Sequence, residues 1–187
     1  MNRKATPLLL AVVLLMGLLA YLSERSRTHT SAQPRPSAEG ATVLSVRAGD
    51  ILQVRVKRDY WNSFRLARSA DGSWKLTEPS NEPASEAGVT RLLSALESLP
   101  ALSVINLPAD DSERHREYGL WKPAIEVTVT TPDGDQTLLV GSATADSKGV
   151  YCARMGKDGV YVTSAEAVQA LSQDLSAYRQ EQNASQP

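Results

Sequence analysis

The chain has 187 residues, with 20 Lys and Arg against 21 Asp and Glu, so its net charge of −1 argues against nucleic-acid binding through a basic surface. Its single cysteine, Cys152, excludes an internal disulfide and any zinc or iron–sulfur site built from several cysteines. Cys152 lies in an apparent strand, where a buried structural thiol is expected. After a membrane segment and a linker, roughly 145 residues remain, which suits one domain with a sizeable core.

The N-terminus has the pattern of a membrane anchor. The run from Ala5 to Ser23 is uncharged and rich in Leu, Val and Ala. As a helix rising about 1.5 Å per residue it would measure about 28 Å, close to the ~30 Å of a bilayer core. A cleavable signal peptide is the alternative, but the run ends without a small-residue cleavage site. Because Arg3 and Lys4 favour a cytoplasmic N-terminus, residues 1–23 are predicted to be a single-pass anchor with the rest outside the cytoplasm.

Residues 24–41 are rich in Ser, Thr, Gln and Pro and carry almost nothing large and apolar, so they are predicted to be a flexible linker. A single α+β domain is expected over residues 42–179. It opens with alternating apolar and polar residues at 52–57, the period-2 pattern of a half-buried strand. Residues 43–47 are predicted to be its partner strand.

A hairpin and a helix follow. Residues 64–68 and 74–77 are predicted to pair across the Asp71-Gly72 turn. Ser85 is placed to cap a helix that Pro100 ends. One face of this helix is apolar, through Val89, Leu92, Leu93, Leu96 and Leu99.

A short strand at 101–105 and a charged connector at 110–117 come next. Two hairpins are predicted from alternation and turn residues, with strands at 125–130, 137–141, 150–155 and 160–163. Ser164 caps a closing helix whose buried stripe is Val168, Leu171 and Leu175. Residues 180–187 are polar and are predicted to be a disordered tail.

The turn at Tyr118-Gly119-Leu120-Trp121-Lys122-Pro123 is predicted to be a structural hinge. Gly119 can adopt a positive φ at little cost, and Pro123 prevents a helix from continuing. Tyr118 and Leu120 are large side chains that would fasten the connector to the core.

The predicted fold class is α+β, with antiparallel β-hairpins and two amphipathic helices packed on the sheet, preceded by one N-terminal transmembrane helix. A weak internal similarity supports a finer arrangement. Ala67-Arg68 precedes Asp71-Gly72 and a helix, as Ala153-Arg154 precedes Asp158-Gly159 and a helix. Chance and a duplication both explain this pattern; a duplication would mean two ββ-plus-helix halves sharing one core.

Several of these residues together resemble the bacterial domain of unknown function 4340 family. The resemblance rests on Trp74-x-Leu76 with Pro79, the Leu-rich helix, Tyr118-Gly119-Leu120-x-x-Pro123, Leu139-Val140-Gly141, Tyr151-x-Ala153-Arg154 and Val160-Tyr161-Val162. It implies a protein of the bacterial inner membrane, anchored by its N-terminal helix, with its domain in the periplasm and a component of a gliding-type ABC transporter as the partner. It implies no catalytic residues and no cofactor.

The motifs for chemistry are weak. Asp110, Asp111, Glu113, His115 and Glu117 could bind a metal ion, but their spacing matches no known loop, and a solvated connector is the alternative interpretation. No nucleophile elbow, phosphate-binding loop or His/Cys dyad is present in the sequence. We therefore expect a protein that is not an enzyme and needs no cofactor.

A basic and aromatic cluster follows the first strand. Its partner-binding candidates are Arg55, Lys57, Tyr60, Trp61, Arg65 and Arg68. Aromatic faces beside cations favour a protein partner, a phospholipid head group or a glycan, whereas a merely solvated sheet face is the alternative. The resulting hypothesis is a non-catalytic, membrane-anchored accessory domain that binds an envelope protein. The alternatives are a module that binds an envelope polymer or lipid head group, and a hydrolase with an unrecognised site.

Overall fold

The computed structural model describes residues 35–36, 42–58 and 62–180 of the chain. The strands are β1 (Arg35–Pro36), β2 (Gln53–Lys57), β3 (Ser63–Arg68), β4 (Trp74–Glu78), β5 (Glu82–Pro83), β6 (Ser103–Ile105), β7 (Ile125–Thr131), β8 (Gly134–Ala143), β9 (Gly149–Arg154) and β10 (Val160–Ser164). The helices are α2 (Glu86–Glu97), α3 (Ser112–Glu117) and α4 (Ala165–Leu171), with 3-10 turns η1 (Ala48–Asp50) and η2 (Leu175–Tyr178).

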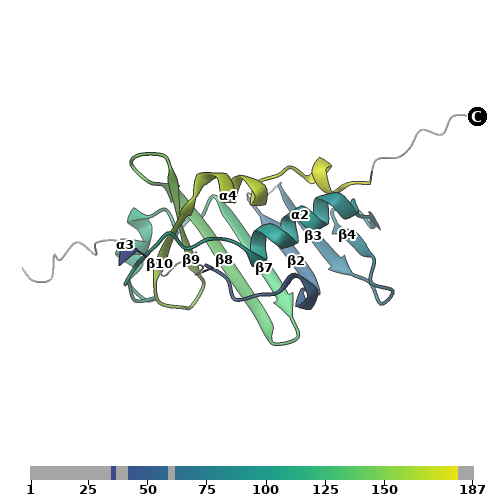
Figure 1. The fold of residues 1–187 in the computed structure, drawn as a ribbon, viewed down its shortest axis with the longest axis horizontal. Helices are drawn as coiled ribbons and strands as arrows, with labels where there is room; N and C mark the ends of the chain where they lie inside the picture. The colour runs from purple at the N-terminus through teal and green to yellow at the C-terminus, as the bar shows by residue number, and fades with distance from the viewer. Residues whose placement is uncertain (1–34, 37–41, 59–61, 181–187) are drawn as a thin grey trace, which may run out of the picture. The chain divides into compact units, whose positions relative to one another are not determined.

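These strands form one antiparallel sheet in the order β1-β6-β10-β9-β8-β7-β2-β3-β4-β5 (Figure 1). The predicted α+β class is confirmed. The predicted hairpins β3–β4, β7–β8 and β9–β10 are all present. Each of the helices α2 and α4 begins at the serine expected to cap it, because Ser85 and Ser164 accept hydrogen bonds from the backbone N–H groups of Gly88 and Ala167.

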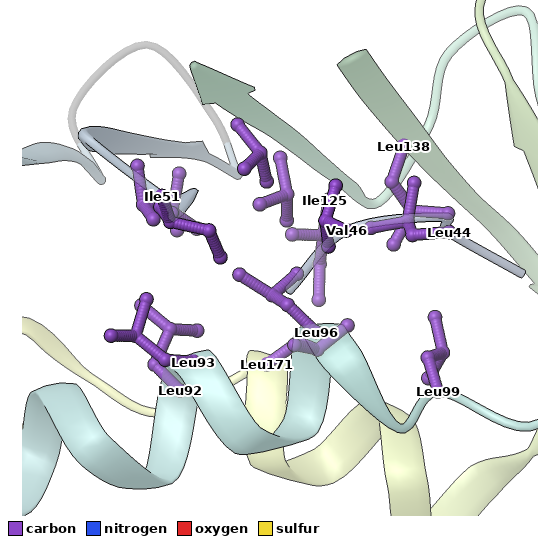
Figure 2. Close-up of a cluster of buried hydrophobic side chains, with 14 of the residues drawn as sticks. Leu44, Val46, Ile51, Leu92, Leu93, Leu96, Leu99, Ile125, Leu138 and Leu171 are labelled. Carbon is purple, nitrogen blue, oxygen red and sulfur yellow. The ribbon is translucent and has the colours of Figure 1, made fainter. Parts of the chain in front are cut away.

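The main core lies between one face of the sheet and the helices α2 and α4. Leu92, Leu93, Leu96 and Leu99 point from the α2 side toward Leu138 and Ile125 of the sheet, and Leu171 of α4 lies beside them (Figure 2). Along β7 every second residue is buried, which is the alternation that the sequence predicted. One face of β2, β7 and β8 is therefore sealed by helices.

The two predicted halves interlock. Each of the hairpins β3–β4 and β9–β10 is followed by a helix on the same face, α2 and α4. The strand after α2, β6, pairs with β10 of the second half. The segment after α4 bridges back to the first half, where Arg179 pairs with Ala84. Each half therefore supplies an edge element to the other.

One strand prediction is wrong. Residues 43–47 do not pair with β2, whose neighbours are β3 and β7. Instead Val43 donates a backbone hydrogen bond to Leu99 at 2.9 Å, and the segment crosses the core face. Val43 and Leu44 are adjacent and both fully buried, which a strand with one solvated face cannot accommodate. The apolar residues of 43–47 therefore mark a buried segment that crosses the core face, and not a strand of the sheet.

Two residues of the predicted linker form a short strand. Arg35–Pro36 pairs antiparallel with β6, Arg35 opposite Val104 and Pro36 opposite Ser103. A proline at an edge strand removes a donor that another chain could use. The predicted anchor at 1–23 lies outside the described residues; none of the helices that the structure describes is long and apolar enough to cross a membrane.

Candidate functional site

The sheet face opposite α2 and α4 is only partly covered. The strands β2, β3, β7 and β8 turn alternate side chains to this side, and these are half-buried or exposed while their neighbours are buried. We call it the open face and define it by Arg55, Lys57, Arg65, Glu126, Thr128, Thr137 and Leu139. Its polar centre is ordered, since the hydroxyls of Thr128 and Thr137 lie 3.0 Å apart.

The segment between β6 and β7 crosses one end of the open face. Ser142 donates a backbone hydrogen bond to the Tyr118 carbonyl at 2.9 Å, and Gly159 donates one to the Leu107 carbonyl at 2.7 Å. A second apolar cluster is sealed beneath this crossing, made of Ile105, Leu107, Leu120, Ala153 and Val160, each at most 6 % exposed. The predicted charged connector is therefore a structural cover, and six of its residues form the helix α3.

The predicted hinge works through close backbone approach. Gly119 has φ 72°, which confirms the expected positive φ. A side chain at Gly141 on β8 would overlap the Tyr118 carbonyl oxygen and lie 3.1 Å from Leu120. The rings of Tyr118 and Tyr151 are 4.6 Å apart and inclined at 48°. The packing of this crossing thus needs glycine at two positions and an aromatic pair beside them.

A shallow apolar hollow lies where the crossing meets the open face. Its volume is about 180 Å³, and its apolar lining is Ala109, Leu120, Trp121, Leu139, Ala153 and Met155. Trp121 and Met155 are 58 % and 54 % exposed, unusual values for large apolar side chains. The guanidinium of Arg116 lies 5.4 Å from the centre of the Trp121 ring and holds one side of it. We call this feature the Trp121 hollow.

The structure divides the predicted partner-binding residues. Arg55, Lys57 and Arg65 share the open face, where Lys57 lies 3.9 Å from Glu126 and Arg65 lies 3.1 Å from Glu78. Arg68 points to the other side, donating to the Gly49 carbonyl at 2.7 Å with its guanidinium 5.3 Å from Trp74. Arg68 is three residues from Arg65 on the same strand. Because side chains alternate along a strand, residues separated by an odd number of positions face opposite sides of the sheet. Tyr60 and Trp61 lie outside the described residues.

Sequence reasoning missed the Trp121 hollow. Trp121 was assigned to the hinge, and Leu139 and Met155 were assigned to strands without a ligand role. A signal existed in the alternation, because Leu139 shares the open-face parity of Thr137 on β8. No local sequence pattern shows that Trp121 and Met155 line the same hollow, because the path of the crossing segment brings them together.

The acidic connector that the sequence offered as a possible metal site shows no metal-binding arrangement in the described residues. Among the described residues, no group of three or more His, Cys, Asp or Glu side chains is placed to hold a metal ion. His115 donates a hydrogen bond from its Nδ1 to the Asp111 carbonyl at 2.7 Å, at the start of its own helix. Asp111 caps that helix through the backbone N–H of Arg114 at 3.2 Å. These two members of the acidic connector therefore have structural roles.

Cys152 is buried, and burial raises the pKa of its thiol to about 12. We expect a chromogenic disulfide reagent at about pH 8 to leave the folded chain unmodified and to label one thiol in denaturant, since the thiolate is the reactive form. Rapid labelling of the native chain would contradict the assignment of Cys152 as a buried structural thiol.

The same pKa shift makes stability depend on pH. The folded-state pKa of Cys152 exceeds the usual value of 9.0, so the unfolded chain loses this proton first. The thiol's contribution to stability is therefore lost progressively as the pH rises above about 9.

These features define an α+β domain with one sheet face sealed by helices and the other left open beside an apolar hollow. Residues 42–186 match the family described as Domain of unknown function (DUF4340), and the chain belongs to this family. Comparisons with curated proteins and with solved structures found no match. Three motifs that carried the resemblance meet at the crossing, namely Tyr118-Gly119-Leu120, Leu139-Val140-Gly141 and Tyr151-x-Ala153.

Proposed function

We propose that this protein is a non-catalytic interaction domain, anchored in the bacterial inner membrane by residues 1–23, which binds an envelope protein through its open face. The observation that carries the proposal is the Trp121 hollow, where the large apolar side chains of Trp121 and Met155 are exposed beside each other. Exposed aromatic residues with nearby arginines are the composition of interface anchors. The family resemblance makes a component of an ABC transporter the first partner to test.

The arrangement of the face supports binding of a protein. Its centre holds Thr128 beside Thr137, and its rim carries partly exposed ion pairs, Lys57 with Glu126 and Arg65 with Glu78. Protein interfaces combine an apolar anchor with such a polar rim. A tether to the membrane would raise the local concentration of the domain near membrane neighbours, so that a modest affinity suffices.

Photo-crosslinking in intact membranes tests the proposal. With benzoylphenylalanine in place of Trp121 in the full chain, ultraviolet light should produce a defined higher-mass adduct. The matched control carries the same residue in place of Thr90, which is exposed on α2. We expect no adduct from position 90, and Trp121→Ala should lower recovery of the crosslinked partner from a probe at Thr128. Adducts from position 90 alone would place the contact on the helical side and contradict the proposal.

A further inference from the structure

The open face contains an unbalanced pair of arginines. Arg55 on β2 lies directly opposite Arg65 on β3. Like charges in this position repel each other and destabilise a sheet. Glu78 neutralises Arg65 at 3.1 Å. Within the part of the chain that the structure describes, Arg55 is exposed and forms no ion pair or side-chain hydrogen bond.

Among the described residues, no acidic side chain of the open face forms an ion pair with Arg55. Glu126 lies 3.9 Å from Lys57, and Glu78 is engaged with Arg65. Asp135 lies on β8 opposite Thr130 of β7. The residue of β7 opposite Arg55 is Thr128, two positions away from Thr130, so Asp135 is not a direct neighbour of Arg55. The centre of the face therefore carries a positive charge that an incoming carboxylate would complement.

A row of side chains connects Arg55 to the Trp121 hollow. Arg55 is opposite Thr128, and Thr128 is opposite Thr137. Met155 continues the row, since its backbone N–H donates to the Thr137 carbonyl at 2.8 Å. Three strand spacings of about 4.8 Å separate Arg55 from Met155, or about 14 Å. An extended peptide covers that length in about four residues.

We propose that the partner contributes an extended acidic segment that crosses the strands, with a carboxylate on Arg55 and an apolar side chain in the Trp121 hollow about four residues away. This inference rests on the proposed function and specifies its ligand. One of the two threonine hydroxyls between these points donates to the other, which leaves one O–H free to donate to a carbonyl group of the segment.

Two fluorescein-labelled peptides of identical composition test the spacing. Both contain one pair of Asp residues and one Leu in a Ser-rich decapeptide. In the first the Leu is four residues from the nearer Asp, and in the second it is adjacent. Measured by anisotropy against the full chain in detergent micelles, the first should bind at least fivefold more tightly. Equal binding, or no binding of either peptide at millimolar protein, overturns the inference.

Charge variants test the site. Arg55→Glu should weaken the first peptide at least tenfold. Arg91→Glu changes an exposed arginine of α2 on the sealed side and should leave binding unchanged. Met155→Ser should remove the preference between the two peptides while keeping the salt dependence that the carboxylate gives. A loss that is equal for Arg55→Glu and Arg91→Glu would show nonspecific attraction and overturn the inference.

The crosslinking experiment separates this inference from the proposed function. The adduct from position 121 should weaken in the Arg55→Glu background, and its partner peptide should carry Asp or Glu about four residues from the crosslinked side chain. An adduct of unchanged yield with a peptide lacking acidic residues overturns the acidic segment and leaves the interaction domain standing. Absence of any adduct from the open face in the parent chain overturns the proposed function itself.

Discussion

Replacing Gly119 with valine is expected to lower the free energy of unfolding by about 3 kcal/mol, through backbone strain and overpacking together. At φ 72° a β-branched residue is strained whatever the available space. The added Cβ would also overlap the Ser142 hydroxyl and lie 2.8 Å from the Ser142 backbone nitrogen, which belongs to the β8 strand and cannot move aside. Denaturant titration followed by circular dichroism measures the change.

The matched control is Gly49→Val. Gly49 has no positive φ, and nothing lies within 4 Å of where its Cβ would be. We expect this variant to stay within about 0.5 kcal/mol of the parent, as surface substitutions usually do. If Gly119→Val melts like Gly49→Val, then the segment between β6 and β7 is not fastened to β8 by this turn, and the cover of the second cluster needs another explanation.

Leu96→Ala is expected to cost about 2–5 kcal/mol, the range for truncating a buried leucine. Leu96 is fully buried and points from α2 into the core, close to Val46 and Ile125 (Figure 2). The loss has two parts, the lost burial of apolar surface and the cavity that a rigid sheet cannot close. Chemical denaturation of the variant, with the slope of the transition checked against the parent, gives the value.

Leu102→Ala is the control for Leu96→Ala, since it removes the same atoms from a side chain that is 53 % exposed. We expect this change to cost less than about 1 kcal/mol. Similar losses in the two variants would mean that α2 does not seal the core face. In that event the distinction between a sealed face and an open face, on which the candidate site depends, would fail.

The candidate site was only half visible in the sequence. Arg55, Lys57 and Arg65 were predicted as binding residues. Arg55 and Lys57 share a face because they are two residues apart on β2, and Arg65 joins them because it lies opposite Arg55. Their position as a binding surface stays a prediction. Arg68 was grouped with them by proximity in sequence, and it lies on the other side because three residues separate it from Arg65.

The Trp121 hollow could not be predicted, because three segments distant in sequence create it. Leu139 comes from β8, Met155 follows β9, and Trp121 follows α3. Their meeting depends on the tight crossing of Tyr118 over Gly141, which is a contact between backbones. No periodicity of apolar residues reports such a contact.

Local chemistry determined the elements of this protein. The serines Ser85 and Ser164 start its helices because their hydroxyls satisfy free N–H groups, and alternation along β7 marks which side is buried. Only the tertiary structure decided that β2 lies beside β7, that residues 43–47 cross the core, and that one sheet face stays open. Strand order and crossings depend on contacts between distant segments, whose free energy no short window of sequence contains.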